Sequence, residues 1–349
     1  MIEKSRETAV TSTPLAVQTS ATVVVPARLH LGFLDLHGGL GRSFGGIGLA
    51  ISGPRTKITI RAATRPQVTG PEKDRVRPHV VTMQRFLGLR GAHSVTIEEV
   101  VPAHAGLGSG TQIALAVAAG LRRLHGIPLD VRGDAIRLGR GARSGVGIGL
   151  FDRGGLVVDG GRGPATGAAP IISHMPFPEC WRVLVVLDPR RQGVHGVEES
   201  AAFTELPPFH EATAAHLCRL VLMKVLPAVS ECDLASFGSA INELQAHLGD
   251  HYAPVQGGSR FNSPDVAVAL GQLERAGAVG IGQSSWGPTG FAFAPSPEAA
   301  NRLIEIVRQH PTCRGLDIRV CTGFNYGADV TTQAHICDEE KIGAINRGR

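Results

Sequence analysis

The chain of 349 residues is 43% hydrophobic and 19% charged, which is enough for two globular domains with substantial cores. Its formal net charge of +5 is dispersed, and its two Trp and two Tyr offer few rings for stacking on bases, so we expect no nucleic-acid binding. Six widely spaced cysteines without a CxxC pair, a polar N-terminus and no apolar run of about 18 residues predict a cytoplasmic protein with no membrane span.

The N-terminal half alternates between strand and helix patterns. Residues 1–20 are expected to form a disordered tail. A glycine-dense segment over 31–48 separates the first two strands, and a second glycine cluster over 139–149 follows the last helix of this half. In chain order we expect strands over 21–26, 56–62, 94–101 and 156–159, and helices over 76–89, 111–125 and 130–138.

The C-terminal half follows an expected linker over 164–178 and contains a third glycine-rich stretch over 277–290. Because neighbouring strands are not always separated by a helix, the pattern favours an α+β fold over a doubly wound parallel sheet. We expect domains over 21–178 and 179–335, and a second tail over 336–349. In this half we expect strands over 181–188, 291–294 and 317–321, and helices over 209–226, 234–248, 264–276 and 296–309.

The segment Gly106-Leu-Gly-Ser-Gly-Thr111 lies between a predicted strand and the best predicted helix. Free backbone N–H groups and the helix dipole favour a phosphate at such an N-terminus, and glycines let the main chain approach the anion. The loop matches neither GxxxxGK[ST] nor GxGxxG. A plain turn in which Thr111 caps the helix is the alternative. The sequence thus predicts a loop that holds a phosphorylated substrate.

Three motifs in order resemble the signatures of the GHMP superfamily, named for galacto-, homoserine, mevalonate and phosphomevalonate kinases. They are PARLHLGFLDLHGGLGRSFGGIGLAI over 26–51, PAHAGLGSGTQIALAVAAGL over 102–121 and GQSSWGPTGFAF over 282–293. The resemblance covers about residues 21–330. It implies a two-domain GHMP-type α+β fold, with a ribosomal protein S5 domain 2-like N-terminal half, a ferredoxin-like C-terminal half and the site in the cleft between them.

Within the superfamily, the motifs resemble those of the β-ribofuranosylaminobenzene 5′-phosphate synthases, which are not kinases. Kinases usually have a second Ser and then Ala after GLGS, whereas Gly110 and Thr111 follow here, and Trp286 and Pro288 stiffen the third motif. The resemblance implies 5-phosphoribosyl 1-diphosphate (PRPP) as donor, 4-aminobenzoate or its 4-hydroxy analogue as acceptor, and loss of CO2 and diphosphate. The alternatives are an ATP-dependent GHMP kinase and a catalytically silent GHMP-like regulator.

The resemblance assigns the leaving diphosphate to the glycine-rich loop, together with Mg²⁺ as cofactor. Ser109 and Thr111 are the predicted metal ligands, because their hydroxyls could reach a metal ion or phosphate oxygens. The superfamily also suggests a homodimer. The substrate-binding residues predicted in this loop are Gly106, Leu107, Gly108, Ser109, Gly110, Thr111 and Gln112.

Asp35 and Arg42 of the first motif are predicted to be catalytic. We expect Arg42 to orient the arene carboxylate with its planar guanidinium, and Asp35 to accept a hydrogen bond from the amine. The alternative is an ion pair between them that fixes the loop. His195, in the glycine-flanked segment Gly193–Gly196, is predicted to be a general acid for the leaving group, or only to fix its loop.

The other predicted substrate contacts come from three stretches. Arg28 and His30 would face the same side of a strand and bind phosphate together, although His30 could be an ordinary half-buried histidine. Arg143 and Ser144, among glycines, are predicted to contact phosphate. The arene wall is assigned to Gln283, Ser284, Ser285 and Trp286, with core packing as the alternative role.

The fourteen histidines predict no zinc site. There is no HExxH motif, and the HxxxH pair of His247 and His251 contains Gly249 where its helix is expected to end. Those two rings are therefore not expected to share a helical face. Any metal is expected to be Mg²⁺ that arrives with the diphosphate.

Overall fold

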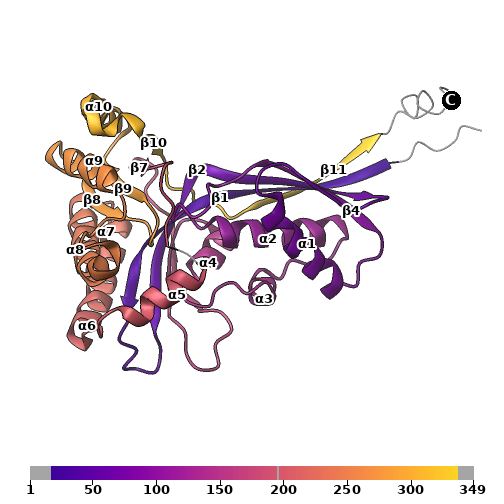
Figure 1. The fold of residues 1–349 in the computed structure, drawn as a ribbon, viewed down its shortest axis with the longest axis horizontal. Helices are drawn as coiled ribbons and strands as arrows, with labels where there is room; N and C mark the ends of the chain where they lie inside the picture. Colours follow the sequence, from indigo (N-terminus) through magenta and orange to yellow (C-terminus); the bar gives the residue numbers. More distant parts are fainter. Residues whose placement is uncertain (1–16, 195, 337–349) are drawn as a thin grey trace, which may run out of the picture.

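The computed structural model describes residues 17–194 and 196–336, and it confirms the α+β class. Two sheets lie side by side with helices packed on them (Figure 1). The larger, seven-stranded sheet contains β1 (Val17–Asp35), β2 (Phe44–Ala63), β3 (Gln67–Thr69), β4 (Ala92–Glu99), β5 (Leu156–Asp159), β6 (Ile171–Met175) and β11 (Asp329–Ile336). The four-stranded sheet, in the order β10-β7-β9-β8, contains β7 (Arg182–Leu187), β8 (Val279–Gln283), β9 (Thr289–Ala294) and β10 (Asp317–Cys321).

The long antiparallel pair β1–β2 connects the two halves. Its first part lies over the N-terminal helices, and its far part, with Leu29 and Leu49, packs into the same core cluster as Phe237 and Phe291 of the C-terminal half. The glycine-dense segment over 31–48 is therefore mostly strand, with a turn over 36–43. Its glycines mark close packing: a Cβ at Gly48 would collide with the side chain of Val146.

Helices cover one face of the large sheet (Figure 1). The core between them combines Ile58 and Ile60 of β2 with Ile113 and Val117 of α2. One of these helices, α4, was not expected, because it begins inside the second glycine cluster. The four helices are α1 (Lys73–Phe86), α2 (Ser109–Leu124), α3 (Val131–Arg137) and α4 (Val146–Arg153).

The small sheet is buried on both faces. One face, with Phe293, packs against Phe237 of α8, and the other, with Leu184, packs against Leu270 of α9 and Val307 of α10. A short helix, α5, falls where none was predicted. The elements of this half are α5 (Gly196–Glu205), α6 (Glu211–Leu220), the π-helical turn η1 (Val221–Val225), α7 (Leu226–Ser230), α8 (Leu234–Tyr252), η2 (Ala253–Gln256), α9 (Pro264–Arg275), α10 (Pro297–Gln309) and η3 (Pro311–Gly315).

Three strands lie in segments to which the sequence analysis gave another domain, a tail or a linker. The final strand β11 pairs with β1 and so belongs to the N-terminal sheet, although it lies in the segment assigned to the C-terminal domain. Residues 17–20, assigned to the tail, belong to β1, whose residues 17–24 pair with β11. The expected linker over 164–178 contains β6, which pairs with β5. Each of these strands is short or polar, so pairing partners distant in sequence decide its structure.

One helical stretch of the described chain, Glu211–Ser230, is long and apolar enough to cross a membrane by length and composition alone, with a mean hydropathy of 1.4. Core helices of globular proteins pass the same test. Here Leu217, Leu220, Val221 and Val225 lie in the hydrophobic core. The apolar composition is therefore weak evidence for a membrane span.

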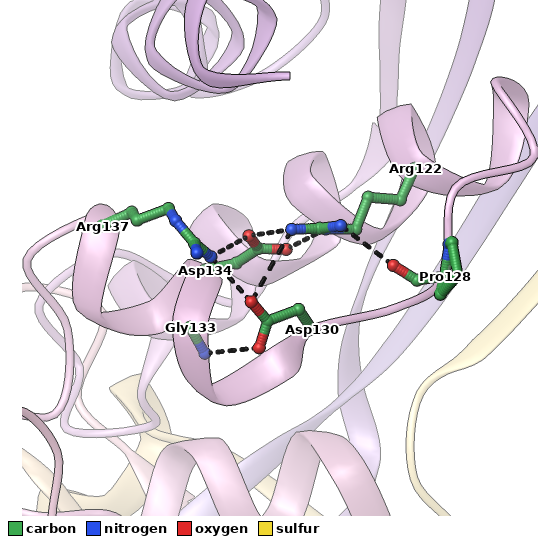
Figure 2. A network of polar contacts seen from close by, with 6 residues as sticks. All are labelled: Arg122, Pro128, Asp130, Gly133, Asp134 and Arg137. Carbon is green, nitrogen blue, oxygen red and sulfur yellow. Dashed lines mark hydrogen bonds and ion pairs between the residues drawn. The ribbon is translucent and has the colours of Figure 1, made fainter.

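A buried ion pair fixes α3 against α2 (Figure 2). Arg122 of α2 donates from Nε and Nη2 to the two carboxylate oxygens of Asp134, at 2.6 and 2.8 Å, and from Nη1 to the carbonyl of Pro128. The Arg122 and Asp134 side chains are only 7% and 2% exposed. Directly after α3, the backbone N–H of Arg140 bonds back to the carbonyl of Ala135, which turns the chain toward the N-terminus of α2.

We predict that Asp134→Ala lowers the free energy of unfolding by about 3 kcal/mol, because it leaves a buried guanidinium without its carboxylate. Urea denaturation measures the change. Asp74→Ala is the control, since Asp74 pairs with Arg77 on the surface and should cost less than about 1 kcal/mol. Equal losses in the two variants would contradict a dominant role for the buried pair.

Candidate functional site

A cavity of about 390 Å³ surrounds the N-terminus of α2, between the two halves of the molecule. Its walls are held together by hydrogen bonds across the domains. Thr289 Oγ1 donates to the carbonyl of Ala105 at 2.6 Å, and Ser284 Oγ donates to that of Gly106 at 2.7 Å. The cavity is lined by Arg28, Arg75, His104, Gly106, Gly108, Ser109, Gly110, Thr111, Arg140, Gly193, Val194, Gly196, Ser285, Trp286 and Gly287.

The helix N-terminus in this cavity has no side-chain cap. Gly108 is the N-cap residue of α2, and no acidic residue lies in the first turn. The alternative in which Thr111 caps the helix is therefore wrong. Gly108 has a φ of 78°, and a Cβ there would lie 2.6 Å from Nε of Arg28, so only glycine fits. The positive end of the helix dipole thus faces the cavity without a built-in negative charge.

Three arginines surround this N-terminus. Arg28 donates from Nη1 to the carbonyl of Gly106 at 3.0 Å, and Arg75 donates from Nη2 to Ser109 Oγ at 3.2 Å. Arg75 and Arg140 both approach Gly110: a Cβ on that glycine would lie 3.5 and 3.2 Å from their terminal nitrogens. None of the described lining residues carries a carboxylate, and Glu72, which lies outside this lining, forms an ion pair with Arg75.

Burial and the nearby positive charge both lower the pKa values of Arg140 and of its neighbour His79. Burial, and then the charge of Arg75, lower the pKa of Arg140, and its Nε is buried without a hydrogen-bond partner. Burial lowers the pKa of His79 to about 4, with further contributions from Arg140 and Arg75. The imidazole is therefore neutral at pH 7 and adds no charge. With no carboxylate among the described lining residues, the arrangement is suited to bind an anion.

Two lining residues other than glycine have left-handed backbone conformations. The φ of His104 is 54° and that of Ser285 is 57°. Such conformations cost of order 1 kcal/mol or more each, and they tend to occur at functional sites. The backbone N–H of Gly193 bonds to the carbonyl of His104 at 2.7 Å, which ties the segment before α5 to the loop.

A smaller pocket adjoins the cavity at Ser285 and Trp286. Its apolar walls include Phe33, Tyr252 and Trp286, and its free volume of about 20 Å³ holds roughly one water molecule. Trp286 stacks on Phe203 with ring centroids 4.7 Å apart and meets Tyr252 edge-on. Its indole Nε1 is buried without a hydrogen-bond partner. Trp286 therefore belongs both to an aromatic cluster and to the wall between the two spaces.

The structure separates Arg28 from His30. Arg28 lines the cavity, whereas His30 lines the small pocket. Burial, and then the charge of Arg28, lower the pKa of His30 to about 3, so the ring is neutral. His30 Nε2 lies 3.3 Å from Ser144 Oγ, which donates to the buried carboxylate of Asp159 at 2.8 Å. His30 and Ser144 thus form a polar chain behind the site instead of a joint phosphate contact with Arg28.

Asp35 and Arg42 lie at the two ends of the β1–β2 turn and line neither space. Asp35 Oδ1 accepts the backbone N–H groups of His37 and Gly38. Arg42 donates to the carbonyls of Gly160 and Gly161 at 2.6 and 2.7 Å. In the described residues they form no ion pair with each other. The predicted catalytic role and the alternative, an ion pair that fixes the loop, both require a different arrangement of the turn.

Several other predicted contacts fall elsewhere. Arg143 lies over the ring of Phe203, 5.0 Å from its centroid, and Arg140 of the same glycine cluster reaches the cavity instead. Leu107 and Gln112 are buried outside the lining. Gln283, predicted for the arene wall, lines the smaller pocket with Ser285 and Trp286, and its Nε2 donates to Gln256 Oε1. His195 lies outside the described residues. Gly193 and Gly196 on either side of it do line the cavity.

The donor set around the loop does not fit a Mg²⁺ ion held by the protein. Mg²⁺ is usually bound by one or two carboxylates together with substrate phosphates. Within the described lining there is no carboxylate, and the hydroxyl of Ser109 already accepts a hydrogen bond from Arg75. Ser109 and Thr111 are in the cavity as predicted, but two guanidinium groups occupy the place of acidic metal ligands.

Sequence reasoning missed Arg75, Arg140 and His79. Arg75 and His79 are one turn apart on α1, where a polar residue every fourth position is typical of any exposed helix face. The sequence did contain a signal for Arg140, because this residue precedes Gly141 in the same glycine cluster from which Arg143 was chosen as a phosphate contact.

Comparisons with known proteins agree with this fold. A family model described as the GHMP kinases N terminal domain matches residues 76–153, and one described as GHMP kinases C terminal matches residues 225–312. The crystal structure of homoserine kinase from Cytophaga hutchinsonii superposes with a TM-score of 0.64 at 18% identity, covering 89% of this chain and 97% of that one.

Closer sequence relatives come from archaea. A protein of Archaeoglobus fulgidus named beta-ribofuranosylphenol 5′-phosphate synthase is 35% identical, covering 78% of this chain and 87% of that protein. A Methanocaldococcus jannaschii protein with the same name is 32% identical, covering 81% of this chain and 93% of that protein. The chain therefore belongs to the GHMP superfamily and, within it, to the family of the beta-ribofuranosylphenol 5′-phosphate synthases.

Proposed function

We propose that this protein transfers ribose 5-phosphate from PRPP to 4-hydroxybenzoate or 4-aminobenzoate, with release of CO2 and diphosphate. The observation that carries the proposal is the cavity in which three arginines and the α2 N-terminus converge without a lining carboxylate among the described residues. Such a site suits a leaving group with several negative charges. The names of the archaeal relatives describe a phosphorylated ribofuranosyl product that carries a phenol.

The donor half of the reaction places the diphosphate at the α2 N-terminus. As the bond from ribose C1 to the diphosphate oxygen breaks, C1 becomes oxocarbenium-like and negative charge builds up on the leaving group. Guanidinium groups already positioned there stabilise this charge more in the transition state than in the ground state. Arg140 is already placed for this role, with Nη1 near Gly110 at the helix N-terminus and Nη2 3.5 Å from His79 Nε2.

The acceptor half forms a carbon–carbon bond. The ring carbon that bears the carboxylate attacks C1, and the carboxylate then leaves as CO2, returning its electron pair to the aromatic ring. The electrons and atoms balance without an oxidant or reductant. The aromatic pocket next to the cavity is the proposed place for the arene, and Phe33, Tyr252 and Trp286 are its walls. Because its free volume is only about 20 Å³, the arene needs the pocket to open.

Besides its aromatic walls, the pocket is lined by Arg260, which pairs with Asp250, and by His30, which brings no charge. With a pKa of about 3 it stays uncharged across the physiological range. The predicted roles of Asp35 and Arg42 require the turn over residues 36–43 to move toward this pocket. Mg²⁺ is proposed only as a companion of the diphosphate, and no step above depends on it.

The second candidate is an ATP-dependent kinase of the same fold, which the structural likeness to homoserine kinase favours. Trp286 and Pro288 argue against it, because they stand where kinases usually have a flexible glycine string beside the nucleotide. Both candidates place an anion at the same loop, so they are separated by their products.

We predict that Arg140→Met weakens the binding of inorganic diphosphate at least tenfold, because a charge-assisted hydrogen bond to an anion contributes about 1.5–3 kcal/mol. Isothermal titration calorimetry measures the affinity. Arg77→Met is the matched control, since Arg77 lies on α1 beside Arg75 but pairs with Asp74 on the surface. Unchanged affinity in Arg140→Met, in a protein that still unfolds like the wild type, would refute the assignment of Arg140.

We predict that the purified protein, given PRPP, releases labelled CO2 and an equal amount of diphosphate from carboxyl-labelled 4-hydroxybenzoate or 4-aminobenzoate. Running the two arenes separately decides the acceptor. ATP with an alcohol acceptor is the parallel reaction, and it should give no ADP. ADP formation without CO2 release would establish the kinase instead.

A further inference from the structure

We propose that His216, Glu243 and His247 form a binding site for a divalent transition metal ion, with Zn²⁺ as the best match. The possible ligand atoms of these three side chains all lie within 4.8 Å of one another. His216 Nε2 is 2.6 Å from Glu243 Oε1, and the rings of His216 and His247 are 5.9 Å apart. Each atom would need to move only slightly to surround one ion.

The helix geometry explains why these residues meet. Glu243 and His247 are four residues apart on α8, so their side chains lie on the same face. His216 comes from the neighbouring helix α6. Helix α8 continues through Gly249 to Tyr252, contrary to the expectation that it ends at that glycine. His251, the partner first considered for His247, packs against Phe209 instead.

The donor types favour a transition metal over Mg²⁺ or Ca²⁺. Two imidazoles and one carboxylate are typical ligands of Zn²⁺, whereas Mg²⁺ and Ca²⁺ prefer oxygen ligands alone. The His216 and Glu243 side chains are 46% and 40% exposed, so an ion can enter and keep water in its remaining positions. Within the described chain, Glu243 has no Lys or Arg at salt-bridge distance, which leaves its charge available to a cation.

The proposed ion would clamp α6 to α8. Helix α6 leads directly into the π-helical turn η1, and Lys224 of that turn donates to Ser239 of α8 at 3.1 Å. This hydrogen bond already joins the α6–η1 segment to α8. A metal that joins His216 to Glu243 and His247 would add a stronger link and stabilise the folded state, since it binds residues that lie together only there. None of the three ligands lines the anion cavity.

The test uses full-length protein without a histidine tag, freed of metal by a chelator that is then removed. Zn²⁺ is titrated against a chromogenic chelator, and Co²⁺ absorption reports the coordination. We expect one equivalent of Zn²⁺ to bind and to raise the melting temperature. His247→Ala and Glu243→Gln should each weaken binding at least about tenfold, since even the loss of a residue that only supports a ligand typically costs about 10–100-fold in affinity.

His125→Ala is the matched control. His125 is an exposed histidine whose Nε2 lies 2.7 Å from that of His93, so this variant also breaks a close imidazole pair. It should bind Zn²⁺ like the wild type. The proposal is overturned if the His247 and Glu243 variants bind Zn²⁺ as tightly as the wild type, if His125→Ala abolishes binding, or if the wild type binds less than one equivalent.

Discussion

The clustering of Arg28, Arg75 and Arg140 around one helix N-terminus is the constraint on which the site depends. Like charges repel, and burial makes the repulsion stronger. Burial first, and then the neighbouring arginine charges, lower the pKa values of Arg140 and His79. Glu72 pairs with Arg75 from outside the cavity, and no carboxylate lies in the described lining itself. A bound anion would remove the repulsion, and this is the physical reason to regard the cavity as a binding site.

The surrounding fold holds these charges in place through unrelated contacts. The Arg122–Asp134 pair anchors α3, whose C-terminal turn then carries Arg140 to the cavity. Strand β1 carries Arg28 and continues into the core of the other half. From that half, Thr289 and Ser284 bond to carbonyls of the glycine-rich loop. The cavity therefore exists only when both halves are folded together.

Much of the fold could be predicted from the sequence, because the signals were local. The α2 helix has apolar residues at helical spacing and a loop rich in glycine before it, and both are where they were expected. The strand β11 was missed, since its polar residues acquire a structure only by pairing with β1. The glycines over 31–48 suggested loops, whereas they allow β1 and β2 to pack closely against neighbouring side chains.

The site was predicted in part for the same reason. The anion-binding loop Gly106–Thr111 can be recognised from the sequence, because its glycine spacing and the helix that follows it are both visible there. Arg75 and Arg140 come from two distant segments, and only the packing of α1 and α3 on α2 brings them together. Asp35 and Arg42 were chosen by resemblance, and the structure places them in a turn outside both spaces.

The most direct measurement is an NMR titration of the His79 imidazole with and without inorganic diphosphate, using His79→Gln to assign its signals. In the free protein, burial and the two arginines lower the pKa of His79 to about 4. An anion between Arg75 and Arg140 offsets their positive charge and favours the protonated ring, so the pKa should rise above about 4, while burial, the larger cause, keeps it below the usual value of about 6.5. If diphosphate binds and the pKa of His79 stays near 4, the anion lies elsewhere and the central claim is wrong.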